Sequence, residues 1–163
     1  MRRLIAALFA VTVCAAAFAE DKPKGEKLDL GTFGGHFEKN NSGLKGDSSF
    51  LLIPDTAAFD KVFGTVPPAG LGKQPPGRKT VPVTKATFET SLVAAVVKRG
   101  DAVTTYSDVA AYLDGDTVTV TYKAETGKPS TAKFASPLFV AVPKDKEKAV
   151  VFVENGKEVG TAK

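Results

Sequence analysis

The sequence predicts a mainly β fold, a single antiparallel β-sandwich or partly open barrel with one short helix at about residues 55–63. The first observation is a clean alternation of apolar and polar residues on both sides of an Asp-Gly turn within residues 106–123. The second is a series of further short apolar segments separated by turns rich in glycine, proline and asparagine. The third is a single segment, residues 55–63, that repeats apolar residues at helical spacing.

Residues 1–19 have the three parts of a secretory signal peptide. Arg2 and Arg3 form a basic start, residues 4–17 are an uncharged apolar run, and Ala17-Phe18-Ala19 is a cleavage signal. The apolar run of residues 4–17 is shorter than the about 20 residues that a membrane-spanning helix needs. We therefore expect an exported protein, periplasmic or extracellular, without a stable membrane span after cleavage.

The single cysteine of the chain, Cys14, lies inside this segment. Lipidation at Cys14 is the alternative to cleavage after Ala19, but Val13 stands where a lipidation signal has a small residue. After cleavage no cysteine remains, so the domain must be stable through packing alone, although the compartment would permit disulfides.

The charge distribution argues against a nucleic-acid partner. The net charge of the full chain is +4, and removal of Arg2 and Arg3 lowers it by two. The remaining basic residues are dispersed and form no cluster that would follow a phosphate backbone.

The first part of the exported chain contains a leader, two strands and the helix. We expect residues 20–27 to be a flexible charged leader to one β-rich domain at residues 28–163. Strands are predicted at residues 28–39, where glycines interrupt the pattern, and at residues 49–53.

Asp55 is a good N-cap for the helix, and Gly64 is a plausible C-cap. Residues 64–83 then hold five prolines and predict a long surface loop.

The second part of the domain is predicted to be strands joined by turns. Beyond the Asp-Gly hairpin, these strands lie at residues 88–98, 131–142, 149–153 and 157–159. The first is almost continuously apolar and predicts a buried central strand. Pro137 marks a bulge or an edge position, and Asn155-Gly156 predicts a second hairpin turn.

The hairpin of residues 106–123 is predicted to have one apolar and one polar face, whether its turn is Asp114-Gly115 or Gly115-Asp116. The apolar face comprises Val109, Ala111, Val118, Val120 and Tyr122. The polar face comprises Tyr106, Asp108, Tyr112, Thr117, Thr119, Thr121 and Lys123. We take five of its residues as the candidate interaction face, namely Tyr106, Tyr112, Thr117, Thr119 and Thr121. An ordinary solvated sheet surface is the structural alternative.

No catalytic, cofactor-binding or metal-binding set of residues emerges from the sequence. His36, the only histidine, has no partners at metal-ligand spacing, and no G-x-S-x-G motif is present to hold a nucleophile. Asp114 and Asp116 are explained as turn residues. Arg99-Gly100-Asp101 spells an adhesion tripeptide, but the end of a strand explains its glycine equally well. We therefore expect a protein that is not an enzyme.

The order of features in residues 88–159 resembles the C-terminal domain of PrcB-type protease-complex subunits. The features are the apolar run at 92–97 before Gly100, the segment Thr104-Thr105-Tyr106 before the hairpin, the sequence PLFVAVPK at 137–144 and VVFV at 150–153. Thr104 and Thr105 stand where the family has a glycine pair. The resemblance implies a non-enzymatic domain that binds and stabilises a secreted protease.

We accordingly expect an exported protein-binding module, an accessory or stabilising subunit of a secreted protease or a partner of another extracytoplasmic protein. Sheet edges offer strand addition as one mode of binding. The alternatives are a small-ligand or glycan-binding sandwich that uses Tyr106, Tyr112 and the proline-rich loop, a protease inhibitor, and a hydrolase built around His36.

Overall fold

The computed structural model describes residues 23–66, 81–144 and 149–163. The predicted signal peptide and most of the predicted proline-rich loop lie outside these ranges. The helices are α1 (Thr56–Val62) and α2 (Thr87–Thr90). The strands are β1 (Glu26–Leu28), β2 (Thr32–Phe33), β3 (His36–Glu38), β4 (Ser48–Ile53), β5 (Phe63–Thr65), β6 (Ser91–Gly100), β7 (Thr104–Asp114), β8 (Thr117–Thr126), β9 (Phe134–Pro143), β10 (Ala149–Glu154) and β11 (Lys157–Ala162).

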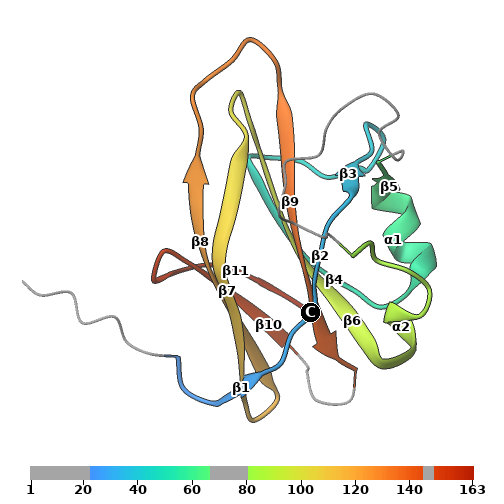
Figure 1. Ribbon diagram of the computed structural model, residues 1–163, viewed down its shortest axis with the longest axis vertical. Coiled ribbons are helices and arrows are strands. Elements are labelled where there is room, and N and C mark those ends of the chain that lie inside the picture. The colour runs from blue at the N-terminus through green and yellow to red at the C-terminus, as the bar shows by residue number, and fades with distance from the viewer. Residues whose placement is uncertain (1–22, 67–80, 145–148) are drawn as a thin grey trace, which may run out of the picture.

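These elements form three layers, which Figure 1 shows from left to right. Sheet A has the strand order β1-β7-β8-β10-β11, and sheet B has the order β2-β9-β6-β4. The third layer, called the cap below, comprises α1, α2, the two-stranded sheet β3–β5 and residues 81–84. The prediction of a mainly β, sandwich-like fold is confirmed, because the sheets pack face to face and do not close into a barrel.

Strand β6 is buried on both faces, which explains its uninterrupted apolar sequence. Ala94 and Val96 face the core between the two sheets, whereas Val93, Ala95 and Val97 face the core under the cap. All five side chains are at most 1% exposed. A strand covered on both faces has no polar side, so the pattern is continuous rather than alternating. The prediction of a buried central strand is confirmed.

Helix α1 begins as the sequence predicts but ends differently. The side chain of Asp55 accepts a hydrogen bond of 2.8 Å from the N–H of Ala58, which is the predicted N-cap. The predicted C-cap at Gly64 is wrong. Phe63 ends the helix with an extended backbone and leads directly into β5. The N–H of Phe63 donates to the carbonyl of Phe59, and the carbonyl of Val62 accepts from the N–H of Lys39 at 2.9 Å, so the end of the helix needs no glycine cap.

Two predicted boundaries differ for reasons of tertiary pairing. The single strand expected at residues 28–39 is three short strands, because each pairs in a different sheet: β1 with β7, β2 with β9 and β3 with β5. The end of the expected flexible leader therefore belongs to sheet A.

The fold has a second short helix, α2, where the prediction placed the start of a strand. Phe88 of α2 is buried under the cap, and β6 begins only at Ser91.

The sheets are largely antiparallel, with one exception. Strand β10 pairs in parallel with β8, from Ala149 opposite Thr117 to Glu154 opposite Tyr122. The chain reaches this register because β9 crosses to sheet B between the two strands. The second predicted hairpin, with its turn at Asn155-Gly156, is confirmed.

Two corners join the sheets. At one corner, Phe50 of β4 lies over Gly160 of β11, where an added Cβ would be 2.3 Å from the phenyl ring. At the other corner, Ser136 of β9 links to β7: its hydroxyl accepts from the N–H of Thr104, and its carbonyl accepts from the hydroxyl of Tyr106.

Candidate binding surfaces

The outer face of sheet A carries an array of uncharged, half-buried side chains. We call it the Tyr112 face, and it comprises Ala110, Tyr112, Thr117, Thr119, Thr121, Ala149, Val151 and Val153. These residues belong to neither of the two hydrophobic cores. The centre of this sheet surface therefore has apolar and hydroxyl groups but no charge.

The strand register orders these residues in rows. The longest row crosses all five strands, as Lys27, Tyr112, Thr119, Val151 and Thr161. Its central three residues are uncharged and half-buried, and its two ends are exposed and polar.

Each of the two neighbouring rows has a charged residue at one end. One row runs from Ala110 through Thr121 and Val153 to Glu158, and the other runs from Asp114 through Thr117 to Ala149. A charge-free centre with a partly charged, polar rim is the composition found in protein–protein interfaces.

Tyr106 does not belong to this face, contrary to the prediction. A β-bulge places Asp108 and Val109 opposite the single residue Tyr122, and Asp108 takes a left-handed conformation with φ of 51°. Because side chains alternate between the two faces of a strand, one extra residue moves the side chains of the preceding residues to the opposite face of the sheet. Tyr106 is therefore only 9% exposed, and its hydroxyl donates to the carbonyl of Ser136 at 2.7 Å. The other four residues of the candidate interaction face do lie on the outer face.

The reversed Tyr106 completes a polar cluster inside the sandwich. Its ring meets that of Tyr122 edge to face, with centroids 5.7 Å apart. Burial raises the pKa of both phenols, and the nearby Glu154 carboxylate raises them further. Glu154 is itself paired with Lys98. The ion pair joins β6 of sheet B to β10 of sheet A, and the buried Tyr122 hydroxyl lies near the Glu154 carboxylate without a full hydrogen bond to any described residue.

Four residues of the Tyr112 face were not predicted: Ala110 of β7 and, in β10, Ala149, Val151 and Val153. The three residues of β10 join the face through the parallel pairing of β10 with β8. The sequence signal was the run Ala149 to Val153, which is apolar at every position although the side chains of one face belong to neither core of the described residues.

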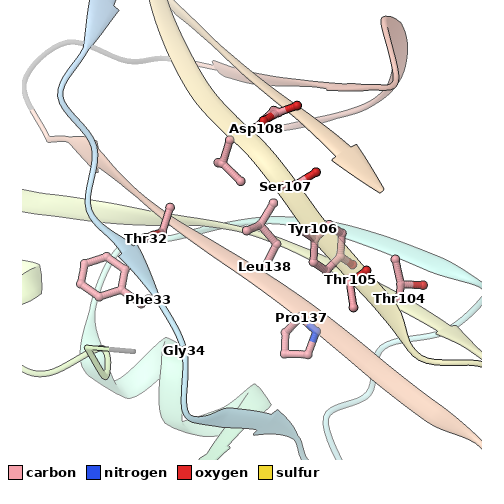
Figure 2. A pocket seen from close by; sticks show the side chains of 11 residues that line it. Thr32, Phe33, Gly34, Thr104, Thr105, Tyr106, Ser107, Asp108, Pro137 and Leu138 are labelled. Atoms are coloured by element: carbon pink, nitrogen blue, oxygen red, sulfur yellow. The ribbon is translucent and has the colours of Figure 1, made fainter. Parts of the chain in front are cut away.

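A groove of about 530 Å³ opens on the side where the edges of the two sheets approach each other. Figure 2 shows the ring of Tyr106 beside Leu138, with Pro137 below and the residues of β2 on the other side. The walls are residues 104–109 of β7 and residues 137–138 of β9. Beyond β2, which pairs only at Phe139 and Val140, no strand in the described ranges covers this side of β9.

The groove is poorly suited to strand addition, although both walls are sheet edges. The N–H of Ala141 donates outward to the carbonyl of Gly31, so the nitrogen of Pro137, four residues earlier in the same strand, points to the same side. Proline offers no donor there, and the bulge at Asp108 twists the opposite wall. The prediction of an edge position for Pro137 is confirmed.

The arginine of the adhesion tripeptide is engaged inside the molecule. Arg99 forms a two-point ion pair with Glu38, with Nε 2.7 Å from Oε2 and Nη2 3.0 Å from Oε1. It also donates to Ser49 and to the carbonyl of Gly46. These bonds hold the loop between β3 and β4, which explains the arginine without an adhesion role.

The remaining candidates for chemistry are dispersed. His36 is buried in the cap, Asp114 pairs with Thr117 at the end of the hairpin, and Asp116 lies in its Gly115-Asp116 turn. Within residues 23–66, 81–144 and 149–163, no three metal-ligating side chains are grouped as a metal site would require. None of the helices in these ranges combines the length and hydrophobicity needed to cross a membrane.

Comparisons of the chain with protein-family models, with curated proteins and with solved structures find no match.

Proposed function

We propose that the chain is an exported, non-enzymatic protein-binding module whose partner docks on the Tyr112 face. The observation that carries the proposal is the row Tyr112, Thr119 and Val151. These residues lie at the centre of a five-stranded sheet and belong to neither hydrophobic core of the described residues. Apolar and aromatic groups with charges at several points of their rim favour a protein surface as the partner.

The class of partner comes from the sequence resemblance. Residues 88–159 resemble a domain that stabilises a secreted protease, and these residues form most of sheet A with the Tyr112 face. We therefore propose an accessory or stabilising subunit of a secreted protease. The signal-peptide pattern of residues 1–19 supports export.

Three positive observations support binding over catalysis or glycan recognition. His36 is held by structural contacts, and Arg99 is engaged by Glu38. Tyr106 lies inside the sandwich, so Tyr112 is left without the second aromatic platform that stacking on a sugar would use.

Affinity capture with a charged variant tests the proposal. Thr119→Lys places a charge at the centre of the face, and we expect it to weaken capture of a secreted protease by about tenfold or more, or about 1.4 kcal/mol. The wild-type protein and the control Glu89→Lys, an exposed position on α2 in the cap, should retain the partner equally.

The bait is the exported protein, and mass spectrometry identifies the polypeptides that it retains. The same measurement gives the first residue of the bait, which tests the predicted cleavage after Ala19. Circular dichroism confirms that both variants fold. Equal retention by Thr119→Lys and wild type would contradict the proposed face, and the absence of any specific polypeptide would contradict the proposed function.

A further inference from the structure

The single histidine of the chain joins the cap to sheet B. His36 lies on β3 and is 8% exposed. Its ring contacts Phe59 of α1 edge to face at 4.9 Å between centroids, and Phe139 of β9 at 5.8 Å. The imidazole is thus surrounded by aromatic side chains from two layers.

His36 also holds the segment that returns to the cap before α2. The main-chain N–H of Val83 donates to Nε2 of His36 at 2.9 Å. Val81 of the same segment runs parallel to Phe33, and its carbonyl accepts from the N–H of Gly34. The side chain of Val83 is buried in the core under the cap.

The hydrogen bond from Val83 fixes the protonation state of the ring. A nitrogen that accepts from an N–H carries no proton, so Nε2 is bare and the proton of the neutral ring is on Nδ1. Nδ1 is buried near the carbonyl of Gly64, although its contacts fall short of a full hydrogen bond.

Among the described residues, few charges lie around His36. On α1, the Asp60 carboxylate acts to raise the pKa, and the carbonyl of Gly64 in β5 acts in the same direction. Lys39 binds the main-chain carbonyl of Asp60, and Glu38 of β3 is paired with Arg99. Residues 81–83 and Phe139 bring no charge. Burial outweighs the two favourable groups, so the pKa of His36 is lowered.

We propose that His36 is an acid-sensitive latch that fastens residues 81–83 to the rest of the cap and releases them on protonation. A proton on Nε2 would face the N–H of Val83, so two donors would oppose each other and the amide would lose its acceptor. The same proton would place a cation among Phe59 and Phe139. Opening at residues 81–83 relieves both penalties by exposing the ring to water.

The direction of the pH dependence follows from the lowered pKa. The closed latch prefers the neutral ring of His36. The stability that the latch contributes is therefore fully present above the ordinary histidine pKa of 6.5 and is lost as the pH falls through the lowered pKa of His36. Between those two values the latch takes up one proton when it opens. The equilibrium constant for opening should therefore rise about tenfold for each unit by which the pH falls.

Hydrogen exchange of the full chain between about pH 7.5 and about pH 5 tests the latch, after correction for intrinsic exchange rates. We expect the protection factor of the Val83 amide to fall about tenfold per pH unit below the ordinary histidine pKa. The Thr104 amide is the internal control, because it also donates at 2.9 Å to a buried side chain, the hydroxyl of Ser136, which does not titrate. Its protection should stay constant.

Two variants and one spectroscopic measurement complete the experiment. His36→Gln keeps an acceptor that does not titrate and should remove the pH dependence at Val83, whereas His36→Phe should lower Val83 protection at every pH. Imidazole nitrogen chemical shifts of the wild type give the tautomer without any mutation, and the only histidine gives a single set of signals. A proton on Nε2 at neutral pH, constant Val83 protection, or a parallel loss at Val83 and Thr104 would each overturn the latch.

Discussion

At the scale of single residues, Asn155 shows how one side chain extends a sheet. It follows β10 in a left-handed conformation with φ of 50°. Its main-chain N–H donates to the carbonyl of Tyr122. Its side-chain amide accepts from the N–H of Ala124 and donates to the carbonyl of the same residue, both at 3.2 Å. The amide thus continues the parallel pairing of β10 with β8 by one more residue.

Replacement of Asn155 separates these two roles. Asn155→Gly keeps the backbone conformation but removes the side-chain bonds, and should cost about 1 kcal/mol because the bonds are exposed. Asn155→Ala adds the cost of a left-handed alanine, about 1 kcal/mol more. Urea unfolding should rank the stabilities as wild type, then glycine, then alanine. Asn40→Gly, in an exposed turn, is the control; a glycine variant as stable as wild type would show that the amide contacts are without consequence.

At the scale of elements, several strand edges in the described ranges carry features that hinder pairing with other chains. Strand β7 has the bulge at Asp108, β9 has Pro137, and β11 has an extra residue, Val159, opposite the junction of Phe152 and Val153. Strands β1 and β2 are three and two residues long. Bulges, prolines and short edge strands all oppose edge-to-edge association. These features favour the Tyr112 face over these edges as the place where a partner binds.

The corner between β7 and β9 depends on one hydroxyl. In Ser136→Ala the buried N–H of Thr104 loses its acceptor, and we expect a loss of about 1–3 kcal/mol in the free energy of unfolding. The bond from the Tyr106 hydroxyl goes to the main chain of residue 136 and should persist. Ser130→Ala, where the hydroxyl accepts from the exposed N–H of Ala132, should cost much less. Chemical denaturation measures both variants, and equal losses would exclude a special role for this corner.

At the scale of the whole molecule, sheet B is shared by two hydrophobic cores. Alternate residues of β6 and β9 enter the core between the sheets and the core under the cap: Leu138 and Val140 face the first, and Phe139 faces the second. Loss of either core would expose one face of the same strands. The two cores should therefore unfold together at neutral pH.

Core substitutions on the two sides of sheet B test this coupling. Phe139→Ala in the cap core should cost about 3–5 kcal/mol, and Val120→Ala in the sandwich core about 1–3 kcal/mol. Each substitution should shift the midpoint of one common unfolding transition. The fluorescence of Tyr106, Tyr112 and Tyr122 reports unfolding of the sandwich, and the NMR signal of His36 reports unfolding of the cap. Separate midpoints for the two probes would show that the layers unfold independently.

The same scales explain what could be predicted of the candidate site. Alternation placed Tyr112, Thr117, Thr119 and Thr121 on one face, because the facing of neighbours within a strand is a local property. Val151 and its neighbours were missed, because the parallel pairing of β10 with β8 joins segments that are separated by a strand of the other sheet.

The sequence by itself determined the strongly patterned elements: the hairpin around Gly115, the buried strand β6 and the capped start of α1 at Asp55. Each depends on residues close together in the chain. Only the tertiary structure decided that Tyr106 points inward, that residues 28–39 divide among three sheets and that β10 runs parallel to β8. A bulge, a sheet assignment and a strand order are chosen by competition among distant partners for hydrogen bonds and apolar contacts, and no local pattern records the outcome of that competition.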